Sequence, residues 1–162
     1  MWKVTLALLA LSSLQISADH IKCKVNGRYF IPNFTANWFK AVEYCSYLEM
    51  RLVVITSAEE QAKVVETVKA SDKFNNRSSS MWIGGSDLAE EGDFYWHSTG
   101  TRLRYSNWGT KQPDNARSVE HCMEIQFIPT ENWLWHWNDR DCKTQRYFIC
   151  ENLEPGKEIE LF

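Results

Sequence analysis

Five side chains with oxygen donors lie in two short segments of the second half of the sequence. They are Gln112, Asp114, Glu120, Asn138 and Asp139. Carboxylate and amide oxygens are hard ligands that suit calcium, which takes about six to eight oxygens at roughly 2.3–2.6 Å. A backbone carbonyl could add a sixth oxygen, and the outer side of the ion would stay open to two hydroxyls of a ligand. The set therefore predicts a calcium site that also binds a hydroxyl-bearing molecule.

Each of these residues taken alone would fit an ordinary solvated loop, where acidic and amide side chains are common. In this sequence, however, they lie beside residues that restrict or crosslink the backbone, namely Pro113, Cys122 and Cys142. Five oxygen donors held in this way favour one shared site over a solvated surface.

A catalytic metal is the rival interpretation of the same cluster. Asp114, Glu120 and Asp139 could hold such a metal, with a histidine as the base: His97, His121 or His136. The sequence contains no HExxH pattern, nucleophile elbow or phosphate-binding loop to support this. Histidines beside tryptophans in strands are more often structural. We therefore expect a protein that is not an enzyme.

Helices in the first half and strands in the second must position these residues. Apolar residues recur at three- and four-residue steps over residues 37–49, and Asn37 or Thr35 is a suitable cap. A second helix is predicted from Ser57 to about Ala70, with a capping box at its start. Residues 71–80 are polar and predict a surface loop.

Short β-rich runs follow at residues 81–83, 94–97, 123–128, 134–137 and 147–150. The stretch from about residue 99 to 118 has little regular pattern, and an irregular run of that length in a compact domain is usually functional. Helices followed by strands indicate an α+β fold.

The N-terminus predicts secretion. A basic start precedes an apolar run at residues 4–11, and Ser17 and Ala18 offer a cleavage point. Residues 1–18 are thus expected to be a signal peptide, too short to span a membrane. Residues 19–152 would form one domain and 153–162 a short C-terminal tail. Asn33 and Asn76 begin glycosylation sequons.

Charge and cysteine content narrow the class further. The formal net charge is −3 and no Lys/Arg block is present, which argues against nucleic acid as a partner. The cysteines are widely spaced and form no CxxC pair, so we expect disulfides and not a zinc site. Their odd number leaves one unpaired, and spacing alone allows several pairings: Cys23, Cys45, Cys122, Cys142 and Cys150.

Residues 23–151 resemble the C-type lectin-like domain family, and the layout is similar to that of secreted insect lectins. The resemblance is carried by Cys45, Trp82-Ile83-Gly84-Gly85, Gln112-Pro113-Asp114, Glu120-His121-Cys122, Trp137-Asn138-Asp139, Cys142 and Tyr147-Phe148-Ile149-Cys150-Glu151. It implies two helices flanking small antiparallel sheets, with a long calcium-binding loop region and disulfide staples.

The resemblance also implies the disulfides Cys45–Cys150 and Cys122–Cys142. The first would tie the opening helix to the last strand, and the second would clamp the calcium loops. It implies a cis peptide before Pro113, which would place Gln112 and Asp114 on the same ion. Cys23 is then left over, as a free thiol or as a link between two chains, and of these we expect the link.

The sugar preference that the resemblance implies follows from hydrogen-bond polarity. Each bound hydroxyl gives its proton to a carboxylate, accepts from an amide and offers a lone pair to calcium. In this family the order Gln112-Pro113-Asp114 goes with galactose-type ligands, here galactose or N-acetylgalactosamine termini. The aromatic residue that usually follows the motif is absent at Asn115-Ala116-Arg117, and the possible substitutes are Trp133, Trp135 and His136.

A second, auxiliary calcium site of the family is matched by Asp87, Glu91 and Asn115, but His121 stands where the family places an aspartate. The resemblance further suggests glycans on cell or microbial surfaces as partners and a role in innate immunity. The alternative is a calcium-independent protein-binding module on the same fold. Such members typically lose calcium ligands, whereas this chain keeps all five.

Overall fold

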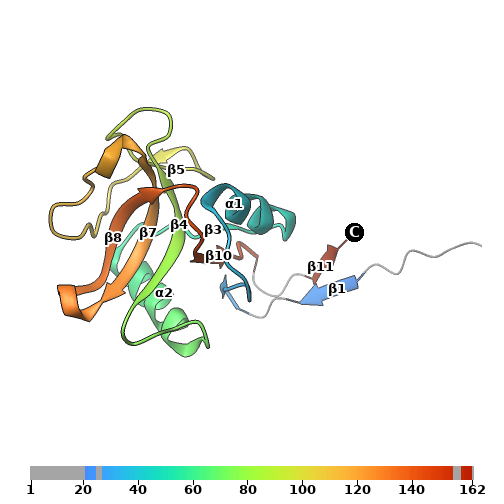
Figure 1. The fold of residues 1–162 in the computed structure, drawn as a ribbon. Coiled ribbons are helices and arrows are strands. Elements are labelled where there is room, and N and C mark those ends of the chain that lie inside the picture. The colour runs from blue at the N-terminus through green and yellow to red at the C-terminus, as the bar shows by residue number, and fades with distance from the viewer. Residues whose placement is uncertain (1–20, 25–26, 155–157, 162) are drawn as a thin grey trace, which may run out of the picture.

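The computed structural model describes residues 21–24, 27–154 and 158–161 of the chain (Figure 1). The predicted signal peptide, residues 1–18, lies outside these residues. In the described part of the chain, no helix is both long and apolar enough to cross a membrane.

Helix α1 (Trp38–Tyr47) begins after the cap that the sequence predicted. The Asn37 side chain accepts a 2.8 Å hydrogen bond from the backbone N–H of Lys40, which satisfies one of the free donors of the first turn. Ala41 and Cys45 are buried on the inner face together with Trp38. The prediction of a helix here is confirmed, although the helix ends at Tyr47.

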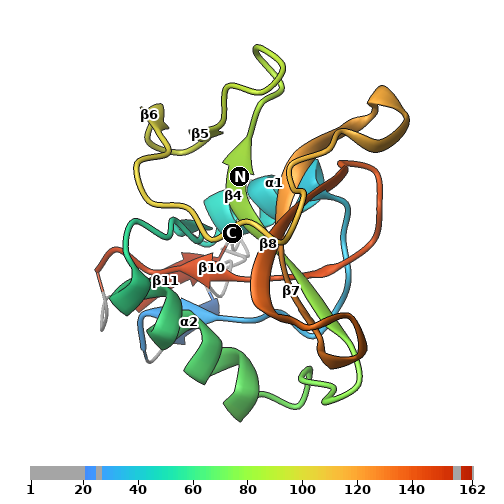
Figure 2. The ribbon, with the colours of Figure 1, turned by 90° about the vertical axis from the view of Figure 1, so that its left-hand side faces the viewer.

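Helix α2 (Ala58–Ala70) has the predicted cap as well. Ser57 Oγ accepts a 3.1 Å hydrogen bond from the backbone N–H of Glu60. Val64 and Val68 are fully buried and pack in a core cluster with apolar residues of the large sheet. α2 therefore lies against one face of that sheet (Figure 2).

The large sheet has six strands in the order β6-β5-β4-β7-β8, with β9 parallel to β4. Its strands are β4 (Ser79–Ser86), β5 (Tyr95–Trp96), β6 (Thr101–Arg102), β7 (Glu120–Ile128), β8 (Trp133–Asp141) and β9 (Tyr147–Phe148). β7 and β8 are joined through η2 (Pro129–Glu131) and are the longest strands. All five predicted β-rich runs contain strand residues of this sheet, although Phe94, His97 and Ile149 lie outside strands and Cys150 belongs to a second sheet.

Two smaller antiparallel sheets are present, as the resemblance implied, but the β-rich runs did not predict most of their strands. One pairs β10 (Cys150–Glu151) with both β2 (Tyr29–Phe30) and β3 (Arg51–Leu52). The other pairs β1 (Ile21–Lys24) with β11 (Glu158–Leu161), and this pair projects away from the rest of the fold in Figure 1. Part of the segment expected to be a tail therefore forms a strand.

Tryptophans make much of the interior. Four of them are fully buried, and two donate their indole N–H to a backbone carbonyl: Trp38 to Ile83 and Trp82 to Ala36, each at 3.0 Å. The disulfides Cys45–Cys150 and Cys122–Cys142 are both present, as the resemblance implied. They lie in the core cluster around α1.

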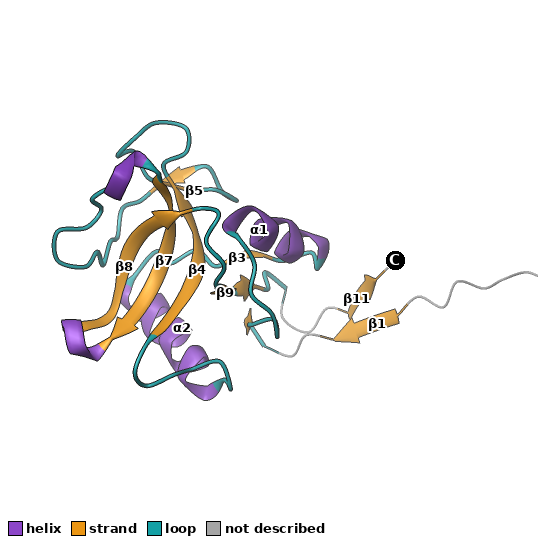
Figure 3. Cartoon of the chain, viewed as in Figure 1, coloured by secondary structure: helices purple, strands orange, loops and turns teal. Residues whose placement is uncertain are grey.

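A long loop leads from β6 to β7 and carries only the short helix η1 (Ala116–Ser118) (Figure 3). It is fastened to β8 by backbone hydrogen bonds from Gly109 N to Trp137 O and from Trp137 N to Asn107 O, both 2.8 Å. The predicted irregular stretch is thus held against the edge of the large sheet beside β8, where the oxygen-rich residues lie.

Candidate functional site

Three carboxylates from three segments meet at the end of the large sheet. Asp114 comes from the long loop, Glu120 begins β7, and Asp139 lies near the end of β8. One oxygen from each lies within 4.8 Å of the others. β7 and β8 bring their two residues together because the strands pair antiparallel, with a bulge between Glu120 and Cys122.

Gln112 contributes a buried acceptor to this region. Its Oε1 has no hydrogen-bond partner, and the Gln112–Pro113 peptide is cis, as the resemblance implied. A buried carbonyl oxygen left without a donor costs about 1–3 kcal/mol unless a ligand satisfies it. An oxygen of this kind two residues before Asp114 fits a bound cation.

The two buried carboxyl groups of the site, Glu120 and Asp139, both have raised pKa values. Burial raises the pKa of the Asp139 carboxyl, and backbone N–H groups of Asn115 at 2.7 Å and Asp114 at 3.2 Å oppose this only in part. Burial also raises the pKa of the Glu120 carboxyl against the opposing charge of Arg140. Both shifts mean that ionised oxygens here lack charge compensation, which a divalent cation would supply.

Asn138 lies behind these carboxylates in β8. Its amide nitrogen donates to Glu124 Oε1 at 3.1 Å and, closely, to the carbonyl oxygen of Asp139. Both amide protons are therefore engaged by the protein. As placed, this amide has no proton left for a ligand hydroxyl, so its remaining contribution to a metal is its oxygen.

Glu124 is the residue that sequence reasoning missed. It is fully buried in β7, and its carboxylate accepts hydrogen bonds from four side chains at 2.7–3.1 Å: Gln126, Asn138, Arg140 and Arg146. Arg140 also reaches Glu120 Oε1 at 3.1 Å. Glu124 thus connects two of the predicted metal ligands, Asn138 directly and Glu120 through Arg140. An acidic residue inside a predicted strand was the available signal.

Two of the three predicted auxiliary ligands lie together in the structure. Asp87 and Glu91 converge with His121, with one ligand atom from each within 4.8 Å of the others. Asn115 is turned to a different partner, because its Oδ1 accepts a 3.0 Å hydrogen bond from the backbone N–H of Glu120.

The three residues considered as substitutes for the missing aromatic residue after Asp114 differ in burial. Trp135 is buried against Phe74 and Phe127 and belongs to the core. Trp133 is half-buried, and its ring lies so close to Gly109 that a Cβ there would meet it at 3.0 Å. His136 Nδ1 accepts a hydrogen bond from the backbone N–H of Leu134. Trp133 therefore has its ring against the long loop, at Gly109.

Both sequon residues, Asn33 and Asn76, are exposed. This exposure is compatible with glycosylation, which stays a prediction.

Comparison with known proteins identifies the fold. The family model described as the lectin C-type domain matches residues 34–152. Salivary C-type lectin 1 of Aedes albopictus is 38% identical over 90% of this chain and 95% of its own length. C-type lectin 16 of Aedes aegypti is 41% identical over 86% of this chain and 91% of its own length.

A solved structure shows the same likeness in three dimensions. The C-type carbohydrate-recognition domain of cow CD23 is 31% identical and superposes with a TM-score of 0.62, over 82% of this chain and 88% of that chain. The matched proteins are lectins, which bind carbohydrate and are not enzymes, so the expectation of a non-enzymatic protein is confirmed. On the family match, the disulfides and the arrangement of helices and sheets, this chain belongs to the C-type lectin domain family.

Proposed function

We propose that this chain is a secreted, calcium-dependent lectin that binds galactose-type termini. The observation that carries the proposal is the meeting of Asp114, Glu120 and Asp139 within 4.8 Å. The Oε1 of Gln112, two residues before Asp114 in the chain, is buried and has no hydrogen-bond partner. Together with Asn138 they would hold the ion, and all five offer oxygen, which calcium prefers.

The bound ion would supply a Lewis-acidic centre that accepts lone pairs from two neighbouring hydroxyls of a sugar. The chain's own residues would orient those hydroxyls. The Asp114 and Glu120 carboxylates can accept hydroxyl protons, and the amide of Gln112 can donate. Asp114 is exposed and Gln112 half-buried, so both can reach a ligand.

The sugar preference rests on the order of amide and acid in Gln112-Pro113-Asp114, which in this family goes with galactose or N-acetylgalactosamine. Trp133 is the remaining aromatic residue that packs against the long loop, and we assign it no more than a supporting contact. With one shallow site, binding should be weak, and clustered glycans or a dimer would raise avidity.

The names of the relatives support a place of action outside the cell. One mosquito relative is named a salivary lectin, and the matched cow domain is described in the presence of an oligosaccharide of N-acetylglucosamine and mannose. With the N-terminal pattern, these names support secretion and glycan recognition outside the cell. Recognition of microbial or other foreign glycans, as in innate immunity, is the role we infer.

A glycan array tests the proposal. The secreted protein is applied in millimolar calcium and again in excess chelator. We expect signals on galactose- and N-acetylgalactosamine-terminated glycans that disappear with chelator. Protein partners bound equally well in chelator, with no glycan signal, would instead favour the calcium-independent protein-binding module.

A further inference from the structure

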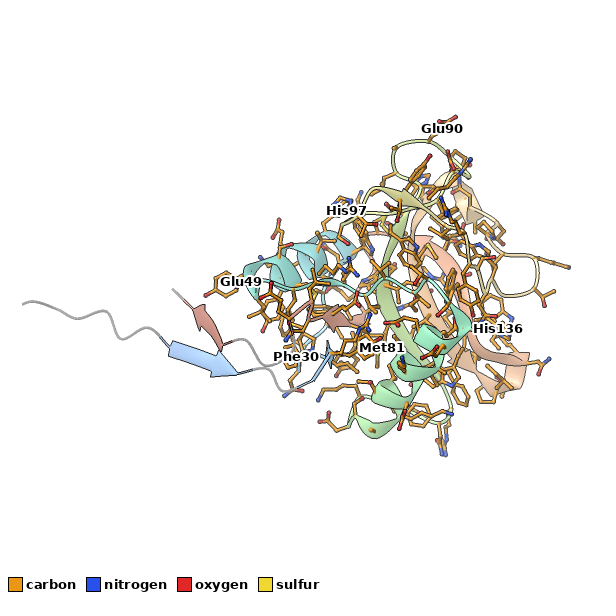
Figure 4. The ribbon with its side chains drawn as sticks, turned by 180° about the vertical axis from the view of Figure 1, so that it is seen from behind. Phe30, Glu49, Met81, Glu90, His97 and His136 are labelled. Carbon is orange, nitrogen blue, oxygen red and sulfur yellow. A yellow bond between two sulfur atoms is a disulfide. The ribbon has the colours of Figure 1, made fainter. Side chains whose placement is uncertain are left out.

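A second cluster of metal-ligating side chains lies between the loop that follows β4 and the start of β7. The backbone N–H of Asp87 donates to the carbonyl of His121 at 3.2 Å, which fastens the loop to the strand. The N–H of Gly92 donates to Asp87 Oδ2 at 2.8 Å and fixes the carboxylate. Glu90, labelled in Figure 4, marks the outer end of this loop.

Three donor atoms meet at this point. His121 Nδ1 lies 3.1 Å from Asp87 Oδ1 and 3.3 Å from Glu91 Oε2. In a tetrahedral zinc site with bonds of about 2.0–2.2 Å, neighbouring ligand atoms are about 3.3–3.6 Å apart. The two spacings from His121 are therefore close to those of a zinc site, and all three donor atoms lie within 4.8 Å of one another.

Charge at the cluster favours a cation. The side chain of Asp87 is only 1% exposed, and that of Glu91, at 55%, reaches solvent. Among the residues that the structure describes, no Lys or Arg forms an ion pair with either carboxylate. A buried carboxylate beside a second one is costly without a positive partner, and His121 supplies one only when its imidazole is protonated.

The chemical types of the donor atoms indicate which cation the cluster would bind. The auxiliary calcium of the family would use an aspartate at position 121, and calcium takes oxygen ligands. Here an imidazole nitrogen replaces that carboxylate, and the oxygen of Asn115 is bonded to Glu120 instead. One nitrogen and two carboxylates suit zinc, which leaves the fourth position for water.

We propose that Asp87, Glu91 and His121 form a zinc site at the position where related lectins place an auxiliary calcium. This proposal does not depend on the proposed function, because the calcium site uses other side chains.

Calorimetric titration of zinc chloride into the calcium-saturated full-length secreted protein tests the proposal. Excess calcium keeps zinc from the Asp114, Glu120 and Asp139 cluster. We expect one zinc per chain. The His121→Ala variant should bind zinc at least about 100-fold more weakly, since a direct ligand should matter no less than the outer partners whose loss costs about 10–100-fold.

Two controls isolate the site. His136→Ala should keep zinc binding unchanged, because His136 lies far from Glu90 and its loop (Figure 4). Cys23→Ser should also keep it, which excludes the thiol as the ligand. If His121→Ala fails to fold, Glu91→Gln removes a ligand at a largely exposed position and should also weaken zinc binding.

The His121→Asp variant gives the reciprocal test, because it should lose zinc and bind a second calcium. The proposal is overturned if the wild-type protein binds no zinc in saturating calcium, if His121→Ala and Glu91→Gln both leave zinc binding intact, or if Cys23→Ser abolishes it. Sugar binding measured in the same samples reports separately on the calcium site.

Discussion

At the scale of single residues, the site is a group of carboxylates that the fold holds close together and partly away from solvent. Asp139 and Glu120 are buried, and Asp114 lies within 4.8 Å of both. Of the residues described by the structure, Arg140 is the one cation that pairs with Glu120. Such an arrangement is unfavourable alone and favourable around a divalent ion. The carboxylates that would bind the ion are therefore the same groups whose charges are unfavourable without it.

Asp114→Asn tests one acid of this set with almost no change of shape. Removing the charge should weaken calcium binding at least about tenfold, or about 1.4 kcal/mol, and abolish detectable sugar binding. Calorimetry with calcium and then with galactose measures both. Asp72→Asn, at an exposed position in the loop after α2, is the matched control and should leave both unchanged. Unaltered sugar binding in Asp114→Asn would remove Asp114 from the site.

The raised pKa values of Glu120 and Asp139 predict a pH dependence whose sign reverses with calcium. Without calcium, the folded protein binds protons at these groups more tightly than the unfolded chain. Their contribution to folding stability is then present at low pH and is lost as the pH rises through the raised pKa. With calcium bound, protonation must first expel the ion, so acid destabilises the protein.

Urea unfolding across the carboxylate titration range, in saturating calcium and in chelator, measures this difference. We expect the stabilisation by calcium to shrink as the pH falls, beginning at a pH above the range of ordinary carboxyls. A calcium effect that is independent of pH through that range would contradict the assignment of these two ligands.

At the scale of elements, strands β7 and β8 position the site and a buried carboxylate holds them in register. Glu124 in β7 binds Asn138 and Arg140 of β8 and Arg146 beyond it. The same contacts orient Asn138 and draw Arg140 toward Glu120. The scaffold and the metal ligands therefore share one hydrogen-bond network.

Glu124→Gln should lower both stability and calcium affinity. It leaves the half-buried Arg146 without a charged partner, so the free energy of unfolding should fall by about 1–3 kcal/mol. Asn138 loses a fixing contact, and the released Arg140 competes for Glu120, so calcium should bind more weakly at a temperature where the variant is folded. Urea unfolding and calcium titration measure the two effects.

Glu43→Gln serves as its control, because Glu43 is exposed and pairs only with Lys40 at the surface. Such pairs contribute little, about 0–1 kcal/mol. Full calcium affinity in a folded Glu124→Gln protein would show that Glu124 stabilises the sheet without positioning the ligands.

The elements that could be predicted from the sequence are those with local signals. The caps Asn37 and Ser57 and the spacing of apolar residues predict both helices. Strands β2 and β3 have two residues each, too few to show alternation, and exist because β10 pairs with them. At the site, residue types and the family resemblance predicted the three carboxylates that meet there. The burial of Glu124 and its hydrogen bonds to Arg140 and Arg146 depend on packing between distant segments.

At the scale of the whole molecule, avidity depends on how many sugar sites one assembly carries. Two cysteine pairs are internal, and Cys23 lies in β1, the strand that pairs with β11 outside the two larger sheets. Two linked chains would present two sugar sites, and the second contact would then form at a high effective concentration.

Non-reducing electrophoresis of the secreted protein tests the link. We expect a band at twice the monomer mass that disappears with reductant, and Cys23→Ser should give the monomer in both conditions. The dimer should agglutinate glycan-bearing particles in calcium more strongly than the variant. A monomer band from the wild-type protein without reductant would rule out the link.

The most direct test of calcium-dependent sugar binding is calorimetric titration of galactose into the purified protein with millimolar calcium and after treatment with excess EDTA. We predict measurable, weak binding in calcium and none in EDTA, with recovery when calcium is restored. Equal binding in both conditions, or no uptake of calcium at millimolar concentration, would contradict the account.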